Sequence, residues 1–170
     1  TQNQSSAASD VYKRQALESL LTQTETDMTL FHRCLAQPEL TVSTFQPAFY
    51  AQELSSDYHA ALTAWLKRYQ ARLAQDGRSQ TARAAAMNAV NPKFVFRNYL
   101  AQQAIELAEA GDFSRIHSLL DVLRKPYDSQ PDHSQFAARR PDWAKTKAGC
   151  SMLSCSCLLY TSPSPRDFEA

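Results

Sequence analysis

One helical stripe constrains the fold of this chain more than any other feature of its sequence. Apolar residues recur there at the spacing of successive helical turns, between Asp57 and Gly77. The stripe consists of Tyr58, Leu62, Trp65, Leu66, Tyr69 and Leu73. A strand would need alternation with a period of two, which this spacing does not fit. We therefore predict a long amphipathic helix from Asp57, with Gly77 as its left-handed C-terminal cap.

Shorter helices are predicted on both sides of the long one. The upstream helix has one apolar face, which consists of Met28, Phe31 and Leu35. Thr24 and Asp27, three residues apart, resemble a weak capping box ahead of it. Downstream, Ser79 is expected to cap an Ala-rich helix.

The dipeptide Asn91-Pro92 predicts the start of another helix. Asn is a good N-cap, and Pro fits the first helical turn, where its missing N–H costs nothing. The apolar face expected for this helix consists of Phe96, Leu100, Ala104, Leu107 and Ala108. Gly111 then ends the periodic pattern, so the helix is predicted to stop there.

A further helix follows a short break with the sequence GDFS. Asp112 or Ser114 is expected to cap it, and Pro126 ends it. Its apolar stripe consists of Ile116, Leu119, Leu120 and Leu123. Two helices with so short a connection are predicted to form an antiparallel hairpin.

Periodicity fades after Pro126. The segment that follows is polar and irregular, with Phe136 and Trp143 as the expected anchors onto the helices. Nowhere does the sequence alternate long enough to predict a sheet. The predicted fold is all-α, with a helical subdomain over 16–126 and an irregular C-terminal arm over 127–156.

Composition excludes several classes of function. With 18 Lys and Arg against 17 Asp and Glu, scattered along the chain, the footprint of a nucleic-acid-binding protein is missing. No apolar run reaches the length of a membrane span, and the N-terminal sequence lacks the apolar region of a secretory signal. Only 3 glycines occur, and no phosphate-binding glycine loop can be built from them.

The cysteines leave several readings open. Cys150, Cys155 and Cys157 lie close together, but their spacing is not that of a zinc site, and no histidine lies near them. A disulfide within the cluster is possible, and free thiols on a flexible tail are the plainest alternative. Cys34, among apolar positions, is expected to be a small buried hydrophobe. We predict no metal site.

No catalytic constellation is evident either. The 4 histidines are dispersed, and none pairs with another at the spacing of one helical turn. The segment AARRPDW, residues 137–143, gathers two Arg, an Asp and a Trp; packing and bonds to helix carbonyls are favoured there over ligand binding. We therefore assign no catalytic or cofactor-binding residue.

Longer stretches of the sequence are more informative about the family of the protein. The sequence NPKFVFRNYLAQQAIELAEAGDFSRIHSLLDVLRKPYD, followed by AARRPDWAKTKAGCSMLSCS, resembles the C-terminal part of the selenoprotein O (SelO/YdiU) family. The upstream segment TETDMTLFHRCLA is also similar to that family, so the resemblance covers about 16–156. It implies a helical C-terminal subdomain of a protein-kinase-like fold.

The resemblance also implies an activity. Members of this family are kinase-like proteins that transfer AMP from ATP to Ser, Thr or Tyr hydroxyls of proteins, with Mg as cofactor. Their nucleotide-binding and metal-binding residues would lie upstream of this chain, which alone should be inactive. The partners implied are the missing kinase-like domain and the protein substrates, with no nucleic acid and no membrane. The location implied is the bacterial cytoplasm, or the mitochondrion of a eukaryote.

A redox-regulatory role is implied for Cys155. Family members end in a Cys-Ser-type terminus, which matches the sequence LSCS here, and the cysteine is thought to pair with a thiol in the activation loop. A thiol on a mobile terminus can reach a distant partner, and its reactivity depends on access and thiolate character. Cys150 is the second candidate.

Both ends are expected to be foreign to the family. Residues 1–15 and 157–170 resemble translated read-through, so we expect both to be disordered and Cys157 not to be a native cysteine. Two rival readings remain: an independent helical protein-interaction module without catalysis, and a thiol-redox protein that acts through Cys150 and Cys155.

Overall fold

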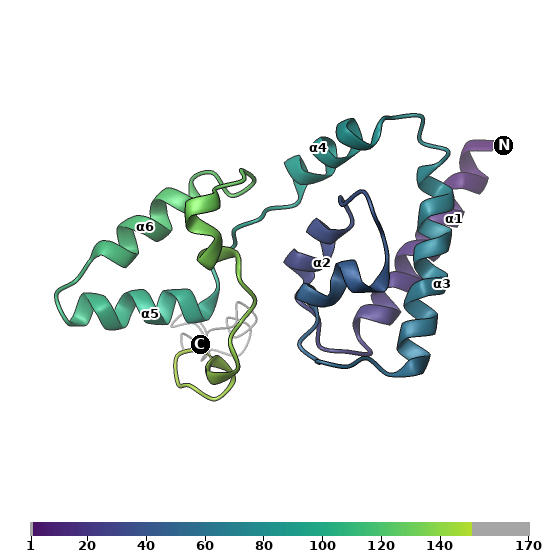
Figure 1. Cartoon of the computed structure of the whole chain (residues 1–170). Helices are drawn as coiled ribbons and strands as arrows, with labels where there is room; N and C mark the ends of the chain where they lie inside the picture. The colour runs from purple at the N-terminus through teal and green to yellow at the C-terminus, as the bar shows by residue number, and fades with distance from the viewer. Residues whose placement is uncertain (1, 151–170) are drawn as a thin grey trace, which may run out of the picture. The chain divides into compact units, whose positions relative to one another are not determined.

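The computed structural model describes residues 2–150, without the side chains at positions 2–10 and 13. Every element of this part is helical, and one isolated antiparallel bridge joins Thr26 to Phe49. The α-helices are α1 (Gln2–Leu21), α2 (Met28–Cys34), α3 (Ser56–Leu73), α4 (Gln80–Val90), α5 (Asn98–Glu109) and α6 (Ser114–Leu123). The 3-10 helices are η1 (Val42–Ala48), η2 (Pro131–Ala137) and η3 (Asp142–Lys145). The all-α prediction is confirmed (Figure 1).

The chain divides into two compact units. Unit 1 runs as far as Lys93 and also includes Tyr127–Ser129. Unit 2 comprises Phe94–Pro126 and the described residues from Gln130 onward. Each unit has a hydrophobic core of its own, and each is described by itself below.

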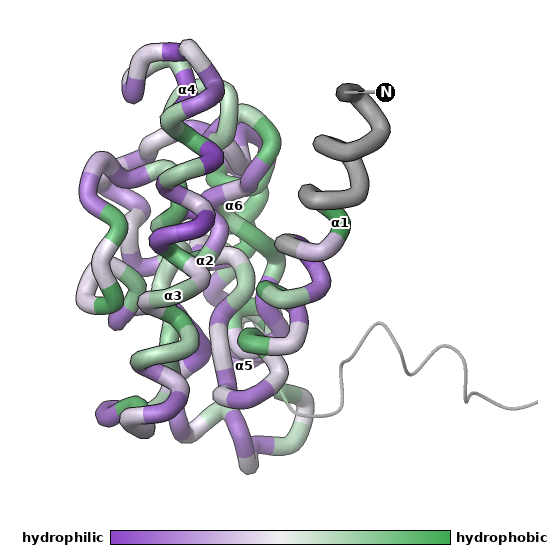
Figure 2. Tube along the Cα trace, turned by 90° about the vertical axis from the view of Figure 1, so that its right-hand side faces the viewer, coloured by the Kyte–Doolittle hydropathy of each residue, from purple (hydrophilic) through white to green (hydrophobic). Residues whose placement is uncertain are grey.

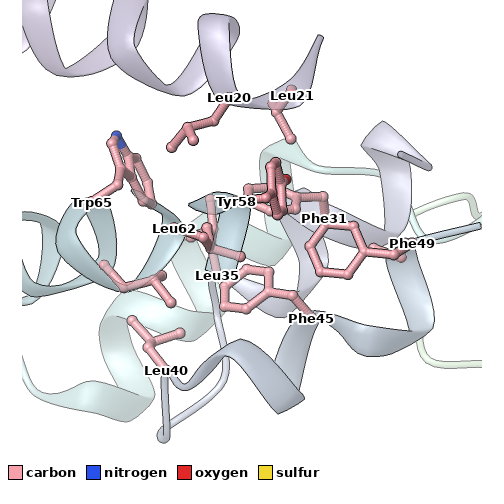
Figure 3. Packing of buried hydrophobic residues seen from close by; sticks show 12 residues of the cluster. Leu20, Leu21, Phe31, Leu35, Leu40, Phe45, Phe49, Tyr58, Leu62 and Trp65 are labelled. Carbon is pink, nitrogen blue, oxygen red and sulfur yellow. The ribbon is translucent and has the colours of Figure 1, made fainter. Parts of the chain in front are cut away.

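Aromatic and leucine side chains together form the core of unit 1 (Figure 3). The ring centroids of Phe31 and Phe45 lie 4.7 Å apart, and both side chains are fully buried. Phe49 packs edge-to-face on Tyr58 of α3 at 5.7 Å. Such ring pairs add stability beyond the burial of their area. The core thus joins α2, η1 and α3 into one packed body.

The predicted stripe of α3 is confirmed. Its first four members are buried and the last two are partly buried against the same core. The Ser55 hydroxyl accepts from the Tyr58 N–H at 3.2 Å and caps the helix. Gly77, past the end of the helix, has φ +61°, the left-handed conformation expected there. Ser79 caps α4, also as predicted, by accepting from the Ala82 N–H.

The start of α2 differs in detail from the expected capping box. Asp27 itself is the N-cap, and its carboxylate accepts from the Leu30 N–H at 3.1 Å. The Asp27 N–H donates to the Ala48 carbonyl at 2.7 Å, next to the Thr26–Phe49 bridge. A contact with η1 therefore places this cap, which the local sequence could not reveal.

Residues 2–15 also differ from the expected disorder, because α1 runs through them without a break. Leu20 and Leu21 at the end of α1 are buried in the core of unit 1, whereas Val11 and Tyr12 are exposed. Packing of one end stabilises a helix that has little support of its own, since continuing a helix costs less than nucleating one. The expected read-through origin of this segment stays a prediction. Residues 157–170 lie outside the described residues.

The predicted helix start at Asn91-Pro92 is wrong. The Asn91 side-chain amide donates to the Met87 carbonyl at 2.9 Å, so Asn91 closes the C-terminus of α4. The next residues are extended, and the Phe94 N–H donates to the Pro126 carbonyl at 3.0 Å. Helix α5 begins only at Asn98. Two hydrogen bonds, one local and one long-range, outweigh the capping preference of the dipeptide.

Unit 2 is built on the predicted hairpin of α5 and α6 (Figure 1). Leu100 and Ala104 face the core as expected, together with Leu119 of α6. The N-cap of α6 is Phe113, which makes no side-chain cap bond, so the expectation of Ser114 as the cap is wrong. The Asp112 carboxylate, one residue earlier, accepts from the Ser114 N–H at 2.9 Å. The arm adds Phe136, Ala144 and other residues to this core. Phe136 is therefore confirmed as an anchor.

Polar residues are interspersed with apolar residues along the helices (Figure 2). Within the described part of the chain, no helix combines the length and the apolar character needed to cross a bilayer.

Candidate functional site

The arm reaches helix α5 just before the segment that carries Cys155. Cys155 and Cys157 lie outside the described residues, so the structure does not test their role. Cys150 is described, and its side chain is only 5% exposed in the core of unit 2. It thus resembles a structural cysteine more than a thiol on a flexible tail.

Helix α5 presents three polar side chains to the arm, one per turn: Asn98, Gln102 and Glu106. The Asn98 amide donates to the Cys150 carbonyl at 3.3 Å, which fixes the backbone at the end of the described arm. Glu106 pairs with Lys147, with an Nζ–Oε1 distance of 2.6 Å. Gln102 donates to the same carboxylate at 3.0 Å. We call this set the polar ridge of α5.

The ion pair sets the electrostatics of the ridge. The hydrogen bond from Lys147, followed by that from Gln102, lowers the pKa of the Glu106 carboxyl. The Lys147 ammonium also lies 5.3 Å from the ring centroid of Trp143, within the range of a cation–π contact. Trp143 in turn packs edge-to-face on Tyr99 of α5 at 6.2 Å, so it is an anchor as predicted, although 42% of it stays exposed.

Gly149 lets the arm approach the ridge closely. Its φ is +85°, a conformation that residues with a side chain rarely adopt. A Cβ at this position would overlap the Gln102 side-chain oxygen. Glycine is therefore needed here both for the turn and for the close contact.

The remaining candidate groups stay apart. Among the side chains that the structure describes, no three of His, Cys, Asp or Glu are placed so that they could hold a metal ion. Cys34 is half-buried against the core of unit 1, and this burial raises the pKa of its thiol. Two residues of the AARRPDW segment make polar contacts outside it. The Asp142 Oδ1 atom lies 3.8 Å from the Lys145 Nζ atom, and the Ala138 carbonyl accepts from the Tyr99 hydroxyl.

Sequence reasoning missed the polar ridge. Its signal was present, because Asn98, Gln102 and Glu106 recur every four residues on α5. The partner Lys147 lies 41 residues beyond Glu106, and no local pattern joins the two. Local spacing can show a polar face, but not what covers it.

Replacing Glu106 with glutamine is expected to loosen the arm. The amide keeps the shape of the side chain and removes the charge that holds Lys147. We expect faster hydrogen exchange over residues 142–150, measured by mass spectrometry. Glu109→Gln on the exposed part of α5 is the matched control and should leave exchange in the arm unchanged.

The same contact predicts a pH dependence. Because the folded state lowers the pKa of Glu106, the pair stabilises the arm above the ordinary glutamate value of 4.5, and this contribution is lost as the pH falls through the lowered folded value. The protection factors of residues 142–150, which correct exchange for the slower intrinsic rate of amides at low pH, should therefore fall on acidification more in the wild type than in Glu106→Gln. An equal fall in both proteins would show that other carboxyl groups control the arm.

Comparison with known proteins gives the family. The model of the family described as "Protein adenylyltransferase SelO" matches residues 3–124. The match begins at residue 3, within the segment 1–15 that we predict above to be foreign to the family. It covers both α5 and α6, and ends before the arm.

Curated relatives agree with this match. A protein from Xanthomonas campestris pv. campestris (strain B100), named "Protein nucleotidyltransferase YdiU", is 50% identical over 152 residues, which cover 86% of this chain and 29% of the relative. The protein of the same name from Methylobacillus flagellatus is 54% identical over 142 residues, with 81% and 27% covered. The chain thus spans less than a third of these relatives. From the family match and these identities, the chain belongs to the SelO family.

Proposed function

We propose that this chain is the C-terminal part of a protein adenylyltransferase that transfers AMP from ATP to Ser, Thr or Tyr hydroxyls of other proteins. The observation that carries the proposal is the family match over residues 3–124, together with relatives about half identical that are named protein nucleotidyltransferases. The oxygen of the accepting hydroxyl forms a bond to the α-phosphorus, the bond to pyrophosphate breaks, and the hydroxyl proton leaves to a base.

The upstream part of the protein would supply this chemistry. Nucleotidyl transfer depends on positioned cations and metal ions, and we assign ATP and Mg to that part. The present chain would contribute helical support to the kinase-like domain. We place the protein in the bacterial cytoplasm, since the relatives cited above come from bacteria.

The tail would add redox control. Cys155 follows Cys150 by five positions, and the Cys150 backbone is held by Asn98. Five residues span at most about 18 Å, so a partner thiol for Cys155 would have to come within roughly that distance of the end of the arm. Disulfide exchange needs access to the thiol, and burial of Cys150 favours Cys155 as the reacting residue.

Labelled ATP tests this proposal. The full-length reading frame that contains residues 1–170 should incorporate labelled AMP into itself or a protein acceptor, whereas residues 1–170 alone should incorporate none. Incorporation by the isolated chain would contradict the assignment of the chemistry to the upstream part. An upstream frame without transfer activity would instead favour a helical interaction module.

The redox role has its own control in the same assay. Oxidant should change the activity of the wild type, and Cys155→Ser should remove that response. Cys34→Ser is the matched control, because a half-buried thiol with a raised pKa reacts slowly. A response that persists in Cys155→Ser would assign the redox control to another thiol.

A further inference from the structure

Unit 2 contains an apolar groove between α5 and α6. Its volume is about 280 Å³, and all the side chains that line it are apolar. Ala101, Ala104 and Ile105 come from α5, and Ile116 and Leu120 come from α6. Phe96, from the extended segment before α5, adds an aromatic side chain to the lining. Among the described residues, no charged or hydrogen-bonding side chain interrupts this lining.

The lining is unusually exposed for such large apolar side chains. Phe96 is 64% exposed, Ile105 44% and Leu120 49%. These three residues come from three different segments and meet at one groove. Apolar side chains scattered singly on a surface need no explanation, whereas exposed apolar side chains gathered at one groove make that groove a candidate docking surface.

A backbone hydrogen bond lies next to Phe96. The Phe94 N–H donates to the Pro126 carbonyl at 3.0 Å, and the Phe94 side chain is buried. Phe96, two residues before α5 begins, is exposed. The segment before α5 thus buries one aromatic side chain and presents another at the surface.

We propose that this groove, which we call the α5–α6 groove, receives an apolar segment from the upstream part of the same polypeptide. The inference rests on the proposed function in one respect, because it requires the upstream part of the polypeptide that the proposed function assigns. Its first support is length, because this chain covers only 29% and 27% of the two relatives reported above. Most of the polypeptide in those relatives therefore lies outside residues 1–170.

The chemistry of the groove restricts the occupant. Since its lining offers neither charge nor hydrogen bonds, the occupant gains affinity by burying apolar side chains. An amphipathic helix that lays apolar residues into the groove fits this requirement. The groove also lies within the part of the chain that the family model matches, as expected for a surface used inside the family's common architecture.

Photo-crosslinking in the full-length protein tests the occupant. Leu120 is replaced by the photoreactive residue benzoylphenylalanine, and crosslinked peptides are identified by mass spectrometry. We expect crosslinks to residues upstream of this chain. The matched control is Phe113, 55% exposed at the hairpin tip and outside the groove, which should give none of these crosslinks.

Every other outcome overturns the proposal. Crosslinks between two copies would assign the groove to self-association, and crosslinks to residues 1–93 would assign it to unit 1. Absence of any specific crosslink would show that the groove is open to solvent. Because the readout is a contact, crosslinks upstream without AMP transfer would refute the proposed activity and leave the docking intact.

A second measurement uses Leu120→Gln. Full-length protein with this change should lose protection from hydrogen exchange across α5 and α6, by about tenfold, because an apolar side chain leaves its buried site. The isolated chain with the same change should exchange as its parent does, since Leu120 is half-exposed there. Phe113→Gln should change neither protein. Equal effects of Leu120→Gln on both would show that Leu120 acts only within the hairpin.

Discussion

Replacing Phe45 with alanine is expected to lower the free energy of unfolding of unit 1 by about 3–5 kcal/mol. The Phe45 side chain is fully buried, and its ring lies 4.7 Å from that of Phe31. Alanine would leave a cavity among side chains from α2, η1 and α3, and such a rigid aromatic cluster can collapse only in part.

Urea denaturation measures this effect. Emission from Trp65, which is 4% exposed in the same core, reports unfolding of unit 1 in a Trp143→Phe background. Phe113→Ala is the matched control, because the same substitution at an exposed position should change stability by no more than about 0.5 kcal/mol. A loss below about 1 kcal/mol for Phe45→Ala would contradict the packing described here.

Replacing Gly149 with alanine is expected to release the end of the arm. The left-handed conformation costs a residue with a side chain about 1–2 kcal/mol. In addition, the new Cβ would displace the Gln102 side chain, and Gln102 would then lose its hydrogen bond to Glu106. We expect amide exchange over residues 142–150 to accelerate strongly, and mass spectrometry would locate the change.

Two further variants separate the two causes. Gly77→Ala also places a side chain at a positive φ, +61°, but has open space around its Cβ, so it shows the cost of a left-handed backbone without an overlap. Gly149→Ala combined with Gln102→Ala removes the overlap and should exchange more slowly than Gly149→Ala with an intact Gln102. If the double variant exchanges faster than Gly149→Ala, the hydrogen bond from Gln102 to Glu106 stabilises the arm more than the overlap with the new Cβ disturbs it.

The sequence predicted the elements whose determinants are local. The α3 stripe, the Ser79 cap and the left-handed Gly77 all follow from spacing and from the conformational freedom of one residue. The start of α5 could not be predicted in this way, because the Phe94–Pro126 hydrogen bond joins residues from opposite ends of the hairpin. Asn91 is equally suited to begin a helix or to close one, and only the fold selects between the two.

The candidate site was predicted in outline only. The family resemblance pointed to the C-terminal arm, and Phe136 and Trp143 were identified as its anchors. The burial of Cys150 was not foreseen, because a Ser- and Cys-rich segment reads as a solvated tail until its backbone is bound by Asn98. The α5–α6 groove does not follow from the sequence either, because the periodic pattern places Phe96 on a helical face, whereas Phe96 precedes the start of α5.

One guanidinium in unit 1 limits the freedom of the segment between α4 and the arm. Arg33 donates to the Asn91 carbonyl at 3.0 Å and to the Tyr127 carbonyl at 3.5 Å, so both ends of the segment 92–126 meet at the same side chain. The two ends of this helical hairpin are thus already joined in the native state, and only its tip is a flexible connection. Doubling the length of a flexible loop costs only about 0.6 kcal/mol in closure entropy. The hairpin tip at Gly111–Phe113 should therefore be a permissive point at which evolution, or a protein engineer, can add residues.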